Sequence, residues 1–204
     1  PAEAGSAAET TAAGDETYLI GICQLVQHEA LDAATQGFKD ALTEKLGDKV
    51  KFDEQNASGD SANCSTIVNG FLSENVNLIL ANATAPLQAA AAATSDIPVL
   101  GTSVTDYATA LEISDWTGTV GTNVSGTSDL APLDQQAAMI KELFPDAKNV
   151  GLLYCSAEPN SVYQCDTIEG YLKDEGYEIE RYAFTDTNDV TSVTQTACDN
   201  SDVI

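Results

Sequence analysis

Short apolar runs alternate with longer amphipathic segments along the first half of the chain. Apolar side chains cluster at 18–23, 50–52, 78–81 and 97–100, in runs that are typical of buried strands. Between the first two runs, positions 30–42 repeat small and apolar residues every three or four places, which predicts an amphipathic helix. This alternation of strand and helix favours a parallel sheet with helices on both of its faces.

Glycine, proline and polar residues set the expected limits of these helices. Gly47 is expected to end the first helix, because glycine adopts the backbone conformations of a helix C-terminus without strain. Asn63 is expected to cap the second helix, whose inward positions include Ile67 and Phe71. Pro86 falls in the first turn of an alanine-rich third helix, where its missing N–H leaves no hydrogen bond unmade.

The alternation restarts after a stretch rich in glycine, threonine and serine at 115–129, which we interpret as a crossover. Beyond it, the pattern predicts helices at 132–144, 160–175 and 189–197, strands at 149–154 and 177–183, and the start of another strand at 203–204. We therefore predict two α/β lobes, lobe one at 17–125 and part of lobe two at 126–204. Because lobe two stops in mid-strand, its sheet would have an unpaired edge, and we expect the native chain to continue.

Residues 1–16 differ from the rest of the chain. They consist mainly of alanine, glutamate, threonine and glycine, without periodicity or large apolar side chains. Such a segment buries too little surface to offset its ordering entropy, so we predict a disordered acidic tether. The chain begins with proline rather than methionine, which indicates a trimmed product.

The charge balance excludes several classes of partner. Only 8 basic residues stand against 32 acidic ones in the 204-residue chain, a formal net charge of −24. Nucleic acids and anionic membrane surfaces both need clustered lysine and arginine, so neither is an expected partner. No apolar run reaches the roughly 18 residues of a membrane-spanning helix.

The chain carries little catalytic or metal-binding equipment. Its one histidine, His28, is not accompanied by a nucleophile motif, and the sequence contains no phosphate-binding loop or zinc-protease motif. The five cysteines form no C-x-x-C pair, which leaves buried thiols or one or two disulfides of unassigned pairing. We therefore predict no catalytic residues, no cofactor and no metal, and interpret His28 as a helix cap or a ligand contact.

The loops after the strands are the expected binding region, because open parallel sheets bind ligands beyond the carboxyl ends of their strands. In lobe one these loops are 24–28, 56–63, 82–85 and 102–108. At 82–85, free N–H groups of a helix N-terminus would attract an anion such as a carboxylate, unless Thr84 merely caps the helix.

Three further loop residues have both a binding and a structural interpretation. Asp106 could bind an ammonium group or cap the short segment after it, and Tyr107 could stack on a ligand. Asp129 could anchor a ligand cation where the lobes meet, or serve as an acidic residue at a helix start. In lobe two, the loop 154–161 offers an aromatic ring, a carboxylate and a helix N-terminus.

Taken in order, these loops resemble one family of proteins. The segments IGICQLVQHEALDAATQGFKDAL (20–42), ILANATAPLQAAAAAT (79–94), IPVLGTSVTDYATA (97–110), GTNVSGTSDLAPLDQQ (121–136) and KNVGLLYCSAEPNSV (148–162) are similar to substrate-binding proteins of ABC transporters of the tryptophan/tyrosine-uptake type. The resemblance covers 18–204 and implies the type I periplasmic-binding fold, in which two lobes on a hinge clamp a small molecule.

This resemblance implies a non-enzymatic protein that captures an amino-acid-like ligand, with an aromatic or branched amino acid favoured, and delivers it to ABC permease subunits. It implies a location on the extracellular face of the membrane, through a lipid anchor upstream of the chain, or in the periplasm. The alternatives are a ligand sensor of the same fold and, less favoured, an α/β hydrolase-type enzyme. The candidate ligand-binding residues are Gln24, Leu25, His28, Asn82, Ala83, Thr84, Thr105, Asp106, Tyr107, Asp129, Tyr154, Ser156, Glu158, Asn160 and Ser161.

Overall fold

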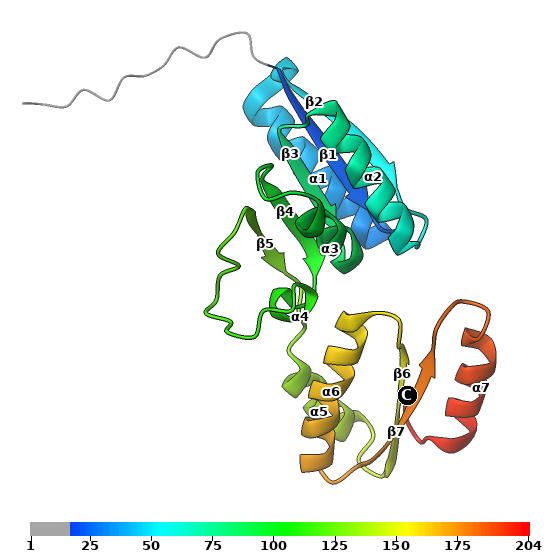
Figure 1. Ribbon diagram of the computed structural model, residues 1–204. Coiled ribbons are helices and arrows are strands. Elements are labelled where there is room, and N and C mark those ends of the chain that lie inside the picture. The colour runs from blue at the N-terminus through cyan, green and yellow to red at the C-terminus, as the bar shows by residue number, and fades with distance from the viewer. Residues whose placement is uncertain (1–16) are drawn as a thin grey trace, which may run out of the picture.

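Two α/β lobes follow one another in the computed structural model of the chain, which describes residues 17–204 (Figure 1). The segment expected to form a tether, 1–16, lies outside the described residues. The fold is the type I periplasmic-binding fold that the alternating pattern and the family resemblance predict, with lobe two represented in part.

Lobe one is built on a five-stranded parallel sheet in the order β2-β1-β3-β4-β5. Its strands are β1 (Tyr18–Gln24), β2 (Val50–Asn56), β3 (Leu78–Asn82), β4 (Val99–Val104) and β5 (Val124–Ser128). The register pairs Ile22 with Leu80 and with Glu54 on its two sides, so β1 is central and its side chains are buried. All the carboxyl ends therefore meet at one edge, which faces lobe two.

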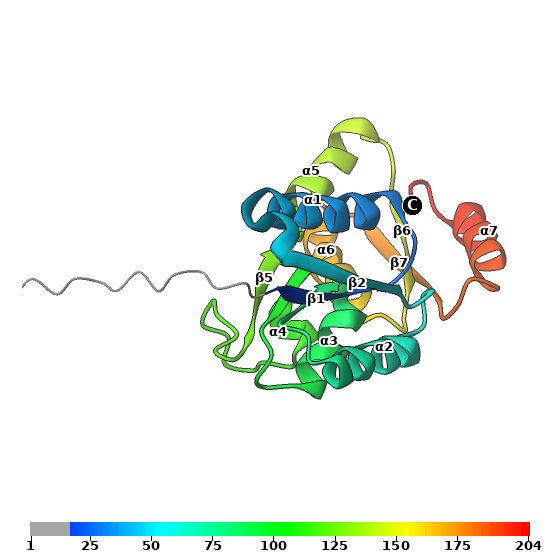
Figure 2. The same ribbon diagram turned by 90° about the horizontal axis from the view of Figure 1, so that it is seen from above.

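Helices cover both faces of this sheet (Figure 2). They are α1 (Glu29–Leu46), which is followed by the short 3-10 turn η1 (Gly47–Lys49), α2 (Ser61–Glu74), α3 (Thr84–Ala93) and the single turn α4 (Tyr107–Ala110). The side chains of Phe38 and Leu42 on α1 pack against one face, while Phe71 of α2 and Leu87 of α3 belong to the cluster on the other. Gly47 ends α1 as predicted, with φ of 57°.

The start of α2 corrects the prediction that Asn63 is its cap. Asp60 is the N-cap, and its carboxylate accepts a hydrogen bond from the Ala62 N–H at 2.8 Å. The amide of Asn63 instead donates to the carbonyl oxygen of Ala57 at 3.1 Å. The helix begins earlier than predicted because the turn before it is tied to the end of β1, through the Ala57 N–H and the Gln24 carbonyl at 2.9 Å.

The crossover stretch contains a strand that the apolar pattern does not reveal. Strand β5 reads VSGTS, has one large apolar side chain, and pairs in parallel with β4, Val124 lying beside Val99. Gly126 has a φ of 157°, and a Cβ atom there would overlap the Tyr107 hydroxyl and the Gly101 carbonyl. Because β5 completes the sheet of lobe one, that lobe extends to Ser128, beyond the predicted boundary near 125.

Tyr107 lies in the core of lobe one, with 7% of its surface exposed. Its hydroxyl donates a hydrogen bond to the carbonyl oxygen of Thr127 at 3.3 Å and thereby fastens β5 to the start of α4. Burial of the ring raises the pKa of Tyr107 to about 12, and the negative charge of Asp129 adds to this effect. The phenol is therefore held in its neutral form.

Tyr107 is expected to make the free energy of unfolding fall in alkaline solution. Below pH 10 both states keep the phenol proton, whereas between pH 10 and about 12 only the unfolded chain releases it. The expected loss is about 2 kcal/mol across that window. Urea unfolding at several pH values should show this slope, and Tyr107→Phe should lack it. A slope that persists unchanged in the phenylalanine variant would contradict the assignment.

Lobe two comprises α5 (Leu133–Leu143), β6 (Asn149–Cys155), α6 (Pro159–Asp174), β7 (Glu178–Phe184) and α7 (Val190–Asn200). Strands β6 and β7 pair in parallel, and Val203 forms a parallel bridge to Val150 on the other side of β6. The residues predicted to open another strand thus lie where a third strand would continue. Helices α5 and α6 lie together on one face of this sheet, and α7 covers the other (Figure 1).

Candidate functional site

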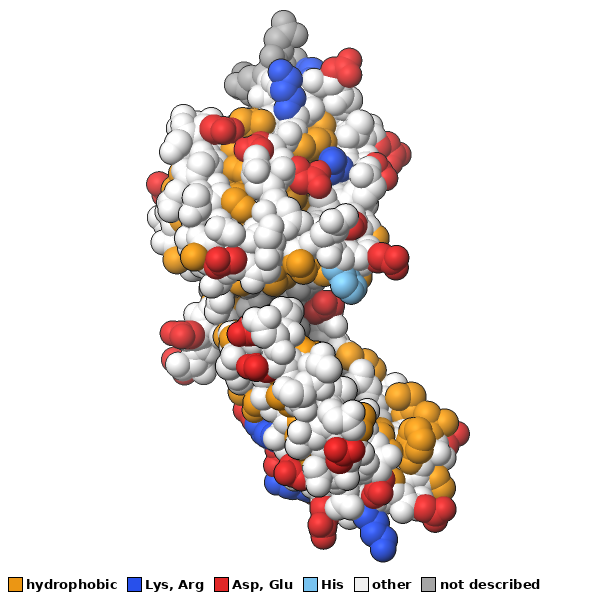
Figure 3. Space-filling view, turned by 90° about the vertical axis from the view of Figure 1, so that its right-hand side faces the viewer, with side chains coloured by type: hydrophobic (Ala, Val, Ile, Leu, Met, Phe, Trp, Pro, Cys, Tyr) orange, Lys and Arg blue, Asp and Glu red, His pale blue; other side chains and the backbone are white. Residues whose placement is uncertain are grey.

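A cleft separates the carboxyl ends of the lobe-one strands from those of β6 and β7. It consists of a cavity of about 510 Å³ that merges with another of about 760 Å³. The two cavities share six lining residues from both lobes, namely Leu25, Val26, Gly59, Cys155, Glu158 and Thr185. Volumes in this range suit a small organic ligand. Figure 3 shows the narrow waist where the lobes meet, and acidic side chains scattered over both lobes.

The turn from β3 into α3 forms the lobe-one wall of the smaller cavity. Ala83 is the N-cap residue of α3, no side chain caps this helix, and Ala83, Thr84 and Ala85 all line the cavity. The Thr84 and Ala85 N–H groups have no acceptor within the helix, because first-turn amides never do. Pro86, the next residue, has no N–H to satisfy. The cleft wall therefore presents the positive end of a helix, and Thr84 does not act as the cap.

Backbone strain gathers at the same wall. Ala83 has a φ of 103° and Ser103 a φ of 54°, conformations that are costly for residues other than glycine. Both residues line the smaller cavity, at the ends of β3 and β4. The Ala83 N–H donates to the carbonyl of Thr102 at 3.0 Å, which holds the two strained turns side by side. Such strain is characteristic of binding sites, where the surrounding fold fixes an unfavourable backbone.

Gln24 and Asn82 lie beneath the cleft rather than in its wall. Thr35 donates to the Gln24 side-chain oxygen at 2.7 Å and accepts from the Asn82 amide at 2.9 Å. Gln24 also donates to the Asp32 carboxylate at 2.6 Å and to the Val26 carbonyl at 2.9 Å. This buried network fixes the loop that brings Leu25 and His28 to the cavity. His28 itself caps α1, its Nδ1 accepting from the Ala30 N–H at 3.2 Å.

Glu158 dominates the lobe-two wall. It precedes α6, its side chain does not cap that helix, and it lines both cavities. The Ser161 hydroxyl donates to the Glu158 carboxylate at 3.3 Å, and the Asn160 amide approaches it at 3.5 Å. Asn160 lines the smaller cavity, whereas Tyr154 and Ser161 line the larger one. A carboxylate on lobe two thus borders the same cavity as the helix N-terminus on lobe one.

The other candidate residues lie elsewhere. Asp106 caps α4 by accepting from the Thr109 N–H at 2.7 Å, which is the structural alternative considered above. The carbonyl of Thr105 accepts from the Ser128 hydroxyl at 2.7 Å. Tyr107 is buried in lobe one and lines neither cavity of the cleft, nor does Asp129, which is exposed at the end of β5. Ser156 borders a separate hollow beside Thr109.

Several lining residues were not among the candidates. They are neighbours of predicted residues or occupy equivalent loops: Val26, Leu31, Gly59, Ser61, Ala85, Gln88, Ser103, Cys155, Ala157, Pro159 and Thr185. Thr185 directly follows β7, so the rule that ligands bind beyond the carboxyl ends of strands could have found it. The apolar members carry no chemical signal of their own, and only the fold brings them together.

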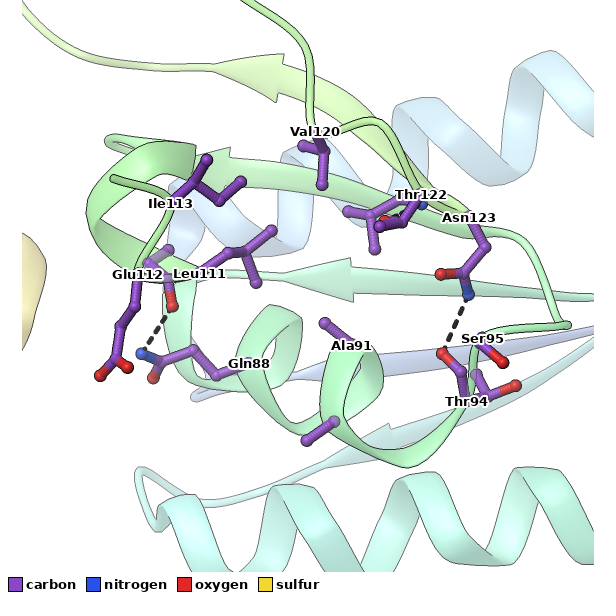
Figure 4. A pocket seen from close by; sticks show the side chains of 13 residues that line it. Gln88, Ala91, Thr94, Ser95, Leu111, Glu112, Ile113, Val120, Thr122 and Asn123 are labelled. Atoms are coloured by element: carbon purple, nitrogen blue, oxygen red, sulfur yellow. Dashed lines mark hydrogen bonds between the residues drawn. The ribbon is translucent and has the colours of Figure 1, made fainter. Parts of the chain in front are cut away.

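A second hollow, of about 500 Å³, lies between α3 and the segment before β5 (Figure 4). Its amide side chains are already engaged, because Gln88 donates to the Ala110 carbonyl at 2.9 Å and Asn123 to the Thr94 carbonyl at 3.0 Å. These bonds fasten the crossover segment to α3, and the remaining lining is largely apolar. Over 17–204, histidine, cysteine and acidic side chains form no group of three or more suited to a metal ion.

Two lobes with parallel sheets, and a ligand-sized cleft between their carboxyl ends, define a two-lobed binding protein of the periplasmic type. The comparison with protein families agrees with this class. The chain belongs to the family of ABC transporter substrate binding proteins, whose model matches residues 19–204. The resemblance noted in the sequence is thereby confirmed, and the family is one of binding proteins rather than enzymes.

Relatives with known ligands are among the similar proteins. A tyrosine-binding protein of Clostridioides difficile (strain R20291) is 38% identical over 188 residues, which cover 91% of this chain and 54% of that protein. The crystal structure of an ABC domain in complex with L-Trp from Streptococcus pneumonia is 33% identical, with a TM-score of 0.86, over 93% of this chain and 65% of that one. The chain therefore spans about half the length of its curated relative.

The comparison also bears on how the two lobes are arranged. A ligand-free, open substrate binding protein with adhesive properties from Clostridium difficile is 36% identical over 88% of this chain and 62% of that one, yet its TM-score is only 0.62. The tryptophan complex, with a similar identity, reaches 0.86. The lobes of this chain thus stand closer to the arrangement of the ligand-bound relative than to that of the open one.

Proposed function

We propose that this chain forms the ligand-capturing part of a solute-binding protein that clamps an aromatic amino acid between its lobes for an ABC importer. One observation carries the proposal: a helix N-terminus on lobe one and the Glu158 carboxylate on lobe two line the same cavity. Opposite partial charges on facing walls suit a zwitterion. The names of the relatives support the ligand class, since one is a tyrosine-binding protein and another was crystallised with L-Trp.

Each end of an amino acid has a complementary wall in this arrangement. The α-carboxylate would accept hydrogen bonds from the Thr84 and Ala85 N–H groups, where the helix dipole favours negative charge. The α-ammonium would donate to Glu158, whose carboxylate is not engaged as a helix cap. Because neither lobe provides both partners, the complete ligand stabilises only the state in which the lobes are close.

The side chain of the ligand would extend into the larger cavity. Leu25, Tyr154 and Phe184 line it, together with the aliphatic stem of Gln164. Aromatic rings prefer such partners, because they bury a large apolar area and pack in offset or edge-to-face geometry. The volume of about 760 Å³ leaves room for a phenol or indole ring.

The family also suggests where the protein works. Members of this family act outside the cytoplasm, and over 17–204 no helix combines the length and hydropathy needed to span a bilayer. We therefore propose an extracytoplasmic protein, held to the membrane by a lipid anchor upstream of 1–16 and docking on permease subunits. Metabolic labelling with a fatty acid, followed by surface proteolysis of intact cells, would test this location.

The substitution Glu158→Gln tests the proposed function. It keeps the shape of the side chain but removes its charge, so calorimetry should show at least a tenfold weaker affinity for L-tryptophan or L-tyrosine. Binding of the corresponding ligand without the amino group, 3-indolepropionate or 3-(4-hydroxyphenyl)propionate, should change little. Asp129→Asn removes a charge outside the cleft and is the matched control. An equal loss for both ligand types, or an effect only in the control, would overturn the assignment of Glu158.

A further inference from the structure

Two of the five cysteines lie against each other in the core of lobe one. Cys23 is the penultimate residue of β1, Cys64 lies in the first turn of α2, and neither has any exposed surface. Their thiols share a hydrogen bond. The other three cysteines belong to β6, α6 and α7 of lobe two.

The surrounding backbone already holds this pair in register. The Ala57 N–H donates to the Gln24 carbonyl at 2.9 Å, and the Gly59 N–H to the Leu25 carbonyl at 2.8 Å. These bonds tie the turn before α2 to the residues that directly follow Cys23. Because a disulfide tolerates only a narrow range of backbone separations, a pair of buried, contacting thiols on two fastened segments meets its main requirement.

We propose that Cys23 and Cys64 form a disulfide bond that fastens the first turn of α2 to the end of β1. The proposal rests on the extracytoplasmic location proposed above, because disulfides persist in oxidising compartments. The bond would lie directly beneath the cleft, since Leu25 on one side and Gly59 and Ser61 on the other line the smaller cavity. It would thereby fix the separation of two segments of the ligand-binding wall.

The bond forms by thiol–disulfide exchange with a small-molecule or enzyme disulfide. The thiolate of one cysteine attacks a sulfur of that oxidant and releases one of its thiols, giving a mixed disulfide. The second cysteine then displaces the other thiol, so two electrons and two protons pass from the protein to the oxidant. In the folded chain, the shared hydrogen bond and burial raise the pKa of Cys23 and disfavour its thiolate. Oxidation is therefore a step that accompanies folding, and the finished bond is shielded from reductants.

The direct test is to map the bond after refolding the protein in a mixture of reduced and oxidised glutathione. Free thiols are alkylated in denaturant, the protein is digested without reduction, and mass spectrometry should find one linked peptide pair containing Cys23 and Cys64. Melting should then occur about 5–10 °C higher than in the same protein refolded with excess reductant. Alkylation of both cysteines, or a bridge from either to another partner, would overturn the proposal.

Two variants sharpen the comparison. In Cys64→Ala, melting should no longer respond to the reductant, whereas Cys198→Ala, which alters an exposed thiol on α7, should behave as the unmodified protein does. If Cys64→Ala fails to fold, the oxidised and reduced forms of the unmodified protein still decide the question. L-Tryptophan binding measured on the same samples separates the two proposals. A missing bond with intact binding overturns the disulfide alone, and an intact bond without amino-acid binding overturns the proposed ligand alone.

Discussion

Replacing Ala85 with aspartate is expected to weaken the binding of L-tryptophan and L-tyrosine at least 100-fold. Ala85 lies in the first turn of α3 and lines the smaller cavity, beside the amides assigned to the ligand carboxylate. An aspartate there would bring a second negative charge to the anion site, and like charges in contact cost several kcal/mol in a binding interface. Its carboxylate would also take the free N–H groups for itself.

The fold should not suffer from this change. Negative side chains stabilise the first turn of a helix through the helix dipole, so Ala85→Asp is expected to melt at or slightly above the temperature of the unmodified protein. Ala92→Asp is the matched control, because it adds the same charge to the exposed end of the same helix, away from the cleft. Calorimetric titration should separate the two variants. Unchanged affinity in Ala85→Asp would show that the carboxylate of the ligand does not bind at α3.

Replacing Gly101 with alanine is expected to lower the free energy of unfolding by about 3 kcal/mol. A Cβ atom at this position would overlap the Tyr107 hydroxyl and lie 3.2 Å from a methyl carbon of Leu87. Inserting a carbon into a packed core forces neighbours out of place, at a typical cost of 1–3 kcal/mol. Here the displaced group also loses its hydrogen bond to Thr127, which adds about 1 kcal/mol.

A double-mutant cycle identifies the tyrosine as the cause. Tyr107→Phe removes the oxygen that the new methyl group would meet, so the double variant should be less destabilised than the sum of the two single variants. Denaturant unfolding of the four proteins gives the interaction energy, which we expect to be about 1 kcal/mol or more in the rescuing direction. Strict additivity would mean that the hydroxyl is not what excludes a side chain at Gly101.

The sequence predicts the elements whose apolar pattern is local. The run 18–23 and the periodic positions of α1 are sufficient to place β1 and its helix, because burial on a sheet requires that spacing. Strand β5 lacks the signal, since VSGTS is recruited by pairing with β4 rather than by its own apolar side chains. Asp60 and Asn63 are both suitable caps, and the choice depends on hydrogen bonds to β1 that are distant in sequence.

The candidate site shows the same division. The loops after β1, β3 and β6 line the cleft, because the carboxyl ends of parallel strands must lie at one edge. Tyr107 follows β4 and shares this edge, yet its ring turns inward to fill the space left by Gly101 and Gly126. Nothing in the residue types of that loop distinguishes a ring that faces a ligand from one that faces two glycines.

The apolar clusters described here remain within single lobes. Two lie on the faces of the lobe-one sheet and the third lies within lobe two, so within 17–204 none of them joins the lobes. Separation of the lobes consequently exposes no hydrophobic core, and domain motions of this kind take microseconds to milliseconds. On the proposed function, the residence time of the cargo is then set mainly by its own bonds to the two walls. A transport partner needs only to weaken those few bonds to take the cargo.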